Sequence, residues 1–105
     1  MKDLKIRGQL IRSDANGLIS LTDIWAAAGF TVNQKPGQWQ RLDSSQKLMM
    51  ALMERIVGKS HNSGKIAVKS IYYSKGAPGT FAHPVLACAY AGYLSPKLEV
   101  EVREV

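Results

Sequence analysis

Apolar and polar residues alternate at the start of the chain, which is the pattern of a strand with one buried face. Leu4, Ile6 and Leu10 are separated by polar residues, and residues 13–17, Ser-Asp-Ala-Asn-Gly, tolerate the positive φ angles of a tight turn. We therefore predict an N-terminal hairpin that turns at 13–17 and returns at 18–19.

The spacing then changes to that of a helix. Apolar residues recur at helical intervals over 21–28, Ser20 stands three residues before Asp23 as in a capping motif, and Gly29 provides a C-terminal stop. This pattern predicts the first helix at 21–28.

Two further helices are predicted after a connection rich in helix-breaking residues. A short helix at 37–43 places Trp39 and Leu42 on its inner face. A longer amphipathic helix at 45–57 follows. Its apolar stripe consists of Leu48, Met49, Leu52, Met53 and Ile56.

The last part of the chain predicts a hairpin and a buried helix. Residues 65–73 are β-branched and aromatic at alternate positions, glycines follow at 76 and 79, and 80–82 can pair back as a short strand. Pro84 suits the first position of an alanine-rich helix at 84–94, which is apolar nearly all round and should be central. Ser95-Pro96 then indicates another helix start, whereas the alternation at 98–103 indicates a strand.

Composition supports one packed domain with an uneven charge distribution. The chain has 105 residues, of which 46% are hydrophobic, enough for a single core. Residues 1–75 hold twelve Lys and Arg against five acidic residues (+7), and residues 76–105 hold two against three (−1). This asymmetry suggests a polyanionic partner, although an ordinary basic surface has the same composition.

Secretion and membrane insertion are not supported. The longest apolar run, 85–91, is far shorter than the roughly 18 residues of a membrane span. Cys88, the single cysteine, has no partner in the chain and is expected as a small buried hydrophobe. We expect a cytoplasmic protein.

Catalytic and metal sites are not predicted. His61, His83 and Cys88 lack the close spacing of a zinc site, and we expect His83 to cap or pack rather than act as a base. Gly58-Lys59-Ser60 resembles the end of a phosphate-binding loop, but it follows a helix and lacks the upstream glycine. We expect no enzymatic activity, cofactor or metal.

Exposed polar residues suit nucleic-acid recognition better. Amides pair with adenine edges, and Arg and Lys pair with guanine or phosphate. The candidates on or beside the short helix are Lys35, Gln38, Gln40, Arg41, Ser44, Ser45 and Lys47, and those on the following hairpin are Lys69 and Lys75. The alternative is an ordinary solvated face.

The ordered motifs resemble the KilA-N domain. They are GLISLTDI at 17–24, Ala28-Gly29, Trp39-x-Arg41-Leu42, GAPGTFAHP at 76–84 and Leu-Ser-Pro at 94–96. The resemblance covers about residues 5–105. Many family members have a basic residue near the glycine turn, where this chain has Ala77-Pro78.

Similarity to this family implies a DNA-binding module of phages, prophages and large DNA viruses, related to the fungal APSES domain. It implies a small α+β domain spanning 1–105, with a winged-helix-like pair at 37–43 and 45–57 and a β-hairpin wing at 65–82. It also favours a helix at 96–103. The resulting hypothesis is a regulatory domain that binds duplex DNA. The alternative is a protein-interaction module that uses Met49, Met50 and Met53 or the C-terminal segment to bind a host or phage factor.

Overall fold

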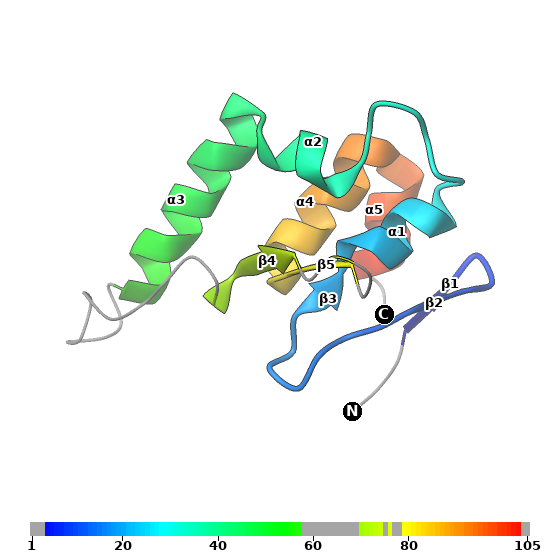
Figure 1. The fold of residues 1–105 in the computed structure, drawn as a ribbon, viewed down its shortest axis with the longest axis horizontal. Helices are drawn as coiled ribbons and strands as arrows, with labels where there is room; N and C mark the ends of the chain where they lie inside the picture. Colours follow the sequence, from blue (N-terminus) through cyan, green and yellow to red (C-terminus); the bar gives the residue numbers. More distant parts are fainter. Residues whose placement is uncertain (1–3, 58–69, 75, 77–78, 104–105) are drawn as a thin grey trace.

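Five helices and five short strands make up the described part of the chain (Figure 1). The structure is a computed structural model and describes residues 4–57, 70–74, 76 and 79–103. The strands are β1 (Leu4–Ile6), β2 (Gln9–Ile11), β3 (Ile19–Ser20), β4 (Tyr72–Ser74) and β5 (Thr80–Ala82). The helices are α1 (Leu21–Ala27), α2 (Pro36–Gln40), α3 (Asp43–Val57), α4 (Pro84–Leu94) and α5 (Pro96–Arg103). The α+β class predicted from the sequence is confirmed.

The N-terminal hairpin forms, but it turns earlier than predicted. β1 pairs antiparallel with β2, and the two residues between them, Arg7 and Gly8, have φ angles of 53° and 81°. Positive φ at both positions is characteristic of a tight hairpin turn, and Gly8 adopts it without steric cost. Residues 13–17 do form a turn, closed by a hydrogen bond from the Asp14 N–H to the Leu18 oxygen. That turn leads into β3, which joins a different sheet.

This second sheet has the strand order β3-β5-β4, with both pairings antiparallel. β5 is central and its three residues are buried. The hairpin predicted for 65–82 is therefore present as β4 and β5. The strand expected at 65–73 begins at Tyr72, because Ser70 and Ile71 precede it in a turn, and 65–69 lie outside the described residues.

Helix ends follow the capping signals. The Ser20 hydroxyl accepts the Asp23 N–H at 3.1 Å at the start of α1, and His83 Nδ1 accepts the Val85 N–H at 3.1 Å at the start of α4. The predicted helices at 21–28 and 84–94 are thus confirmed to within a residue.

The conflicting signals at 96–103 resolve in favour of a helix. Leu98 and Val102, four residues apart, are buried on one face of α5, whereas Val100 is exposed. Glu99 and Arg103 form an ion pair of 2.8 Å with the same spacing. A strand would bury Val100 on the same face as Leu98 and Val102, so the exposure of Val100 and the packing of α5 against α4 show that the helical spacing decides the outcome.

The core is built around α4, which lies among α1, α2 and α5 (Figure 1). Leu86, Ala87, Tyr90 and Ala91 of α4 have no solvent exposure. Ile11, Leu21 and Ile24 from the N-terminal half belong to the same cluster. The prediction of a central, buried, alanine-rich helix is confirmed.

Candidate nucleic-acid interface

Helices α2 and α3 meet at a sharp corner, which we call the helix corner and define as residues 35–47 (Figure 1). Trp39 anchors it from inside, with 3% of its surface exposed and its ring 5.6 Å from that of Tyr90, edge to face. Leu42 was expected beside Trp39 on the inner face, but 38% of it is exposed. The reason is that α2 ends at Gln40, so helical spacing does not extend to Leu42.

Three tyrosine hydroxyls hold the connection that enters α2. Tyr90 donates to the Gln34 oxygen at 2.6 Å, and longer hydrogen bonds of 3.4 Å join Tyr93 to the Asn33 oxygen and Tyr72 to the Pro36 oxygen. Burial raises the pKa of Tyr90, so its hydroxyl stays protonated and able to donate. Sequence reasoning missed these anchors, because nothing in the local pattern links a tyrosine to a carbonyl more than 30 residues away.

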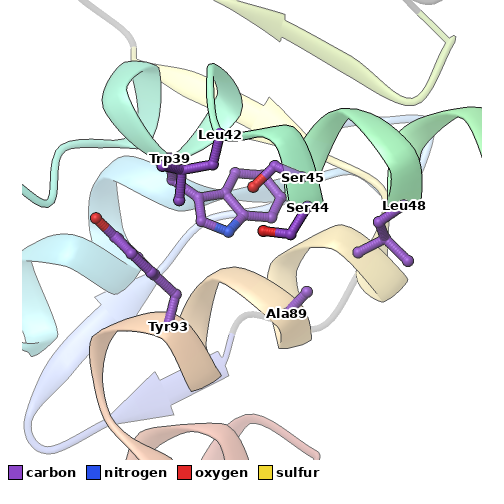
Figure 2. A pocket seen from close by; sticks show the side chains of 7 residues that line it. All are labelled: Trp39, Leu42, Ser44, Ser45, Leu48, Ala89 and Tyr93. Carbon is purple, nitrogen blue, oxygen red and sulfur yellow. The ribbon is translucent and has the colours of Figure 1, made fainter.

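The outer side of the helix corner is polar. Gln40 is half-buried, and the remaining predicted contacts on this surface are exposed. The exposed residues are Lys35, Gln38, Arg41, Ser44 and Lys47. Of the nine predicted residues, five are therefore exposed and one is half-buried within residues 35–47, and Ser44 among them also lines a pocket against α4 (Figure 2).

Ser45 is the exception on the helix corner, since 2% of it is exposed. Ser45, Met49 and Leu52 follow the spacing i, i+4, i+7 and share the buried face of α3. The Ser45 hydroxyl therefore cannot reach a DNA strand in this conformation, and we remove Ser45 from the predicted interface.

The hairpin of β4 and β5 lies beside the helix corner. Tyr72 of β4 contacts the start of α2, and the charge of Arg41 partly offsets the rise that burial causes in the Tyr72 pKa. Gly76 and Gly79 in the connecting turn have φ angles of 69° and 106°, which confirms their predicted structural role. Lys69 and Lys75, the two hairpin lysines predicted to contact phosphates, lie outside the described residues.

Several basic residues form ion pairs, whereas Lys35 and Arg41 form none with the described residues. Arg7 pairs with Glu101 at 2.9 Å and Arg12 with Asp23 at 2.8 Å, so part of the positive charge is neutralised within the fold. Lys35 and Arg41 flank α2 and have no ion-pair partner among the residues that the structure describes.

Two contacts limit what the helix corner offers to DNA. Asp43 lies 3.1 Å from the Lys47 ammonium and is itself exposed, so it partly neutralises this surface. The Gln38 side-chain oxygen accepts the Lys35 backbone N–H at 3.1 Å, which caps α2. Gln38 would have to release this hydrogen bond to pair with both adenine groups in the major groove.

His83 and Cys88, the described residues that could support catalysis or metal binding, have surroundings that fit a structural role. His83 caps α4 and burial lowers its pKa, whereas burial raises the pKa of the Cys88 thiol. Across 4–57, 70–74, 76 and 79–103, no three His, Cys, Asp or Glu side chains gather as a metal site would require. Within the same residues, every helix is too short or too polar to span a bilayer.

Comparison with known proteins gives one family and one curated relative. The KilA-N domain model matches residues 3–105. Protein kilA of Escherichia phage P1 is 30% identical over 99 residues, which cover 94% of this chain and 34% of that protein. The chain therefore spans about a third of the relative's length. No solved structure matches it. With nearly every residue covered by the family model, the chain belongs to the KilA-N domain family.

Proposed function

We propose that this chain binds duplex DNA through the helix corner and the adjacent β4–β5 hairpin. The observation that carries the proposal is the pair of exposed basic residues, Lys35 and Arg41, which flank α2 without an ion-pair partner in the described part of the chain. Trp39 and the three tyrosine anchors fix the backbone beneath them. Membership of the KilA-N family supports the same reading.

The proposed contacts divide into base reading and phosphate binding. Arg41, Gln38 and Gln40 carry the groups that pair with guanine or adenine edges, and α2 is the element that enters the major groove. Lys35, Ser44 and Lys47 bind phosphates of the same segment. Lys69 and Lys75 of the hairpin segment contact flanking phosphates, as a wing does.

We further propose that this binding is regulatory and serves a phage or prophage in the cytoplasm of its bacterial host. The matched relative is a phage protein. The chain's own chemistry is binding rather than catalysis in this proposal, and it requires neither metal nor cofactor.

Protein binding is the second candidate, and two exposed apolar residues favour it. Phe30 and Val32 are 57% and 82% exposed in the loop between α1 and α2. The methionines of α3 give it less support than expected, because Met49 is buried and Met53 half-buried, which leaves Met50 exposed.

Arg41→Ala tests the DNA proposal against a matched control. Loss of a bidentate base contact should weaken duplex binding by about tenfold or more and relax sequence preference at one position. Lys97→Ala removes the same charge from an exposed position on α5 and should change affinity by less than about twofold. Fluorescence anisotropy with duplex DNA, single-stranded DNA and RNA at two salt concentrations measures both.

The salt dependence separates the two candidates. Duplex binding through several phosphates should fall steeply as salt rises, whereas an apolar protein interface should change little. Absence of duplex binding at low salt, or equal losses for the two variants, would contradict the proposed surface.

A further inference from the structure

Two apolar side chains are exposed in the connection from α1 to α2, which we call the entry loop and define as residues 28–34. Val32 is 82% exposed and forms a turn with Asn33, and Phe30 is 57% exposed. Apolar groups stabilise a protein when they leave water, so the fold gains little from either side chain. A partner that covers both would gain from them.

The backbone of the entry loop is fixed from below. The Thr31 oxygen accepts the Trp25 indole N–H at 2.9 Å, and the Phe30 N–H donates to the Trp25 oxygen at 3.0 Å. The rings of Trp25 and Phe30 lie 5.0 Å apart, edge to face. Tyr93, which rises from α4 in Figure 2, donates to the Asn33 oxygen at 3.4 Å. The loop therefore presents its apolar side chains in a defined position before any partner binds.

Backbone conformation sets Phe30 apart from an ordinary exposed residue. Phe30 and Asn33 have φ angles of 55° and 63°. Asparagine tolerates this region, whereas a bulky aromatic residue adopts it at a conformational cost that glycine would avoid. Strained positions of this kind cluster at functional sites, so the aromatic side chain favours a role in binding.

The charge around the entry loop suits a polyanion. Residues 24–42 contain Lys35 and Arg41 and no acidic residue. Proteins that bind the minor groove of DNA insert apolar side chains between base steps and use amides such as that of Asn33 to contact base edges. The exposed apolar pair is also compatible with a protein partner, but positive charge without a carboxylate in this segment favours duplex DNA.

The entry loop lies where it can reach the groove next to the one that α2 occupies. In Figure 1, the loop and the helix corner form one edge of the molecule. Lys35 stands three residues after Val32 and three before Gln38, and each of these intervals spans at most about 11 Å. With Gln38 in the major groove, Lys35 lies at the phosphate strand that borders it, and the tip of the loop lies beyond that strand.

We propose that the entry loop enters the minor groove beside α2, where Val32 and Phe30 insert at a base step and kink the duplex. Such a wedge bends DNA towards its major groove, which draws the duplex around α2. The cost is lowest at flexible pyrimidine–purine steps, so the preferred DNA site should include one. This contact rests on the proposed function, because it requires α2 to lie in the major groove.

Bending and affinity of matched valine variants test the wedge. The probes are duplexes that the parent protein selects from a random pool, labelled at both ends for resonance energy transfer. Parent protein should increase the transfer, because a kink brings the ends together. Val32→Ser should abolish the increase and weaken binding by about three- to tenfold. Val100→Ser makes the same change at a 54% exposed position on α5 and should preserve both.

Salt dependence separates the wedge from the phosphate contacts. Val32→Ser removes no charge and should leave the dependence of affinity on salt unchanged, whereas Lys35→Ala should reduce its slope by about one. Sites selected by the parent should be enriched in TA or CA steps, and sites selected by Val32→Ser should lose this enrichment. Both positions are exposed, so thermal unfolding should be nearly unchanged in the two variants.

The two levels of the proposal fail in different ways. Absence of duplex binding by the parent at low salt would remove the proposed function and this contact with it. Duplex binding without bending, or bending that Val32→Ser retains, would overturn the wedge and leave the major-groove contact in place. Bending that is lost in Val32→Ser and kept in Val100→Ser, with an unchanged salt slope, would establish it.

Discussion

At the scale of single residues, Asp43 works against the proposed DNA contact. Its exposed carboxylate lies on the helix corner and holds the Lys47 ammonium at 3.1 Å. Asp43→Asn removes a negative charge from the surface that faces phosphates and releases Lys47 to bind them. We expect duplex affinity at low salt to rise about three- to tenfold, measured by anisotropy.

The control for this variant is Glu54→Gln, which removes the same charge from an exposed position near the other end of α3. It should raise affinity by less than Asp43→Asn does. Asp43 also stands in the first turn of α3, where a negative charge favours the helix, so the variant should lose a few tenths of a kcal/mol of stability. Equal gains for the two variants would show that net charge, rather than position, governs affinity.

His83 couples one helix cap to pH. Burial lowers its pKa below the ordinary value of 6.5, and the neutral Nδ1 caps α4. A lowered folded-state pKa means that this contribution to stability is present above pH 6.5 and is lost as the pH falls through the folded-state value. The loss should approach that of a helix cap, about 1 kcal/mol.

His83→Asn isolates this effect, because asparagine caps helices and does not titrate. Chemical unfolding between neutral and mildly acidic pH should show a smaller loss of stability for the variant than for the parent. His61 is present in both proteins, so the difference between their pH profiles is the relevant quantity. Parallel pH profiles would exclude a role for the His83 cap.

At the scale of elements, Gly79 sets the path from the turn into β5. It has a φ of 106°, and a Cβ at this position would lie 2.8 Å from the Thr22 hydroxyl. That hydroxyl also accepts the Thr80 N–H at 3.0 Å. Gly79→Ala should therefore destabilise the domain by more than about 1 kcal/mol, seen as a lower midpoint of thermal unfolding.

Gly37→Ala is the matched control for Gly79. Gly37 lies in α2, and a Cβ there would meet no atom within 4 Å. Alanine should stabilise this helix by about 0.5 to 1 kcal/mol. Opposite signs for the two substitutions are the expected result, and a loss of stability in both would mean that α2 needs glycine for another reason.

The connection into α2 depends most on Tyr90. Tyr90→Phe deletes the 2.6 Å hydrogen bond and leaves the Gln34 carbonyl without that donor. We expect a loss of about 1 to 2 kcal/mol in the free energy of unfolding, with weaker duplex binding as the entry to α2 loosens. Tyr93→Phe, whose hydrogen bond is 3.4 Å long, should cost less in both measurements.

Local signals predicted the elements well wherever a cap or a proline marks an end. Ser20, Pro84 and the Ser95-Pro96 pair each stand within a residue of an observed helix start. The first hairpin was misplaced because Arg7-Gly8 is a weaker turn signal than the longer polar segment at 13–17. Both segments turn, and the sequence pattern did not show which of them closes β1.

At the scale of the whole molecule, the candidate site was predicted better at its surface than beneath it. Exposed residues such as Arg41 follow from polarity and charge, which the sequence contains directly. Ser45 was misplaced because its burial depends on the packing of α3 against Trp39 and α4, contacts formed across the fold. The tyrosine anchors depend in the same way on residues far apart in the chain.

Those anchors have a consequence for how the surface can change over time. Tyr72, Tyr90 and Tyr93 hold carbonyl oxygens of the connection at 33–36, and every amino acid supplies that group. The side chain of Gln34 can therefore be exchanged without loss of its carbonyl's bond, whereas Asn33, with a φ of 63°, and Pro36, which is buried at the start of α2, are constrained by backbone conformation and packing. Relatives with a different target sequence could arise by substitution on a preserved frame, so the domain is well suited to acquire new specificities in few mutational steps.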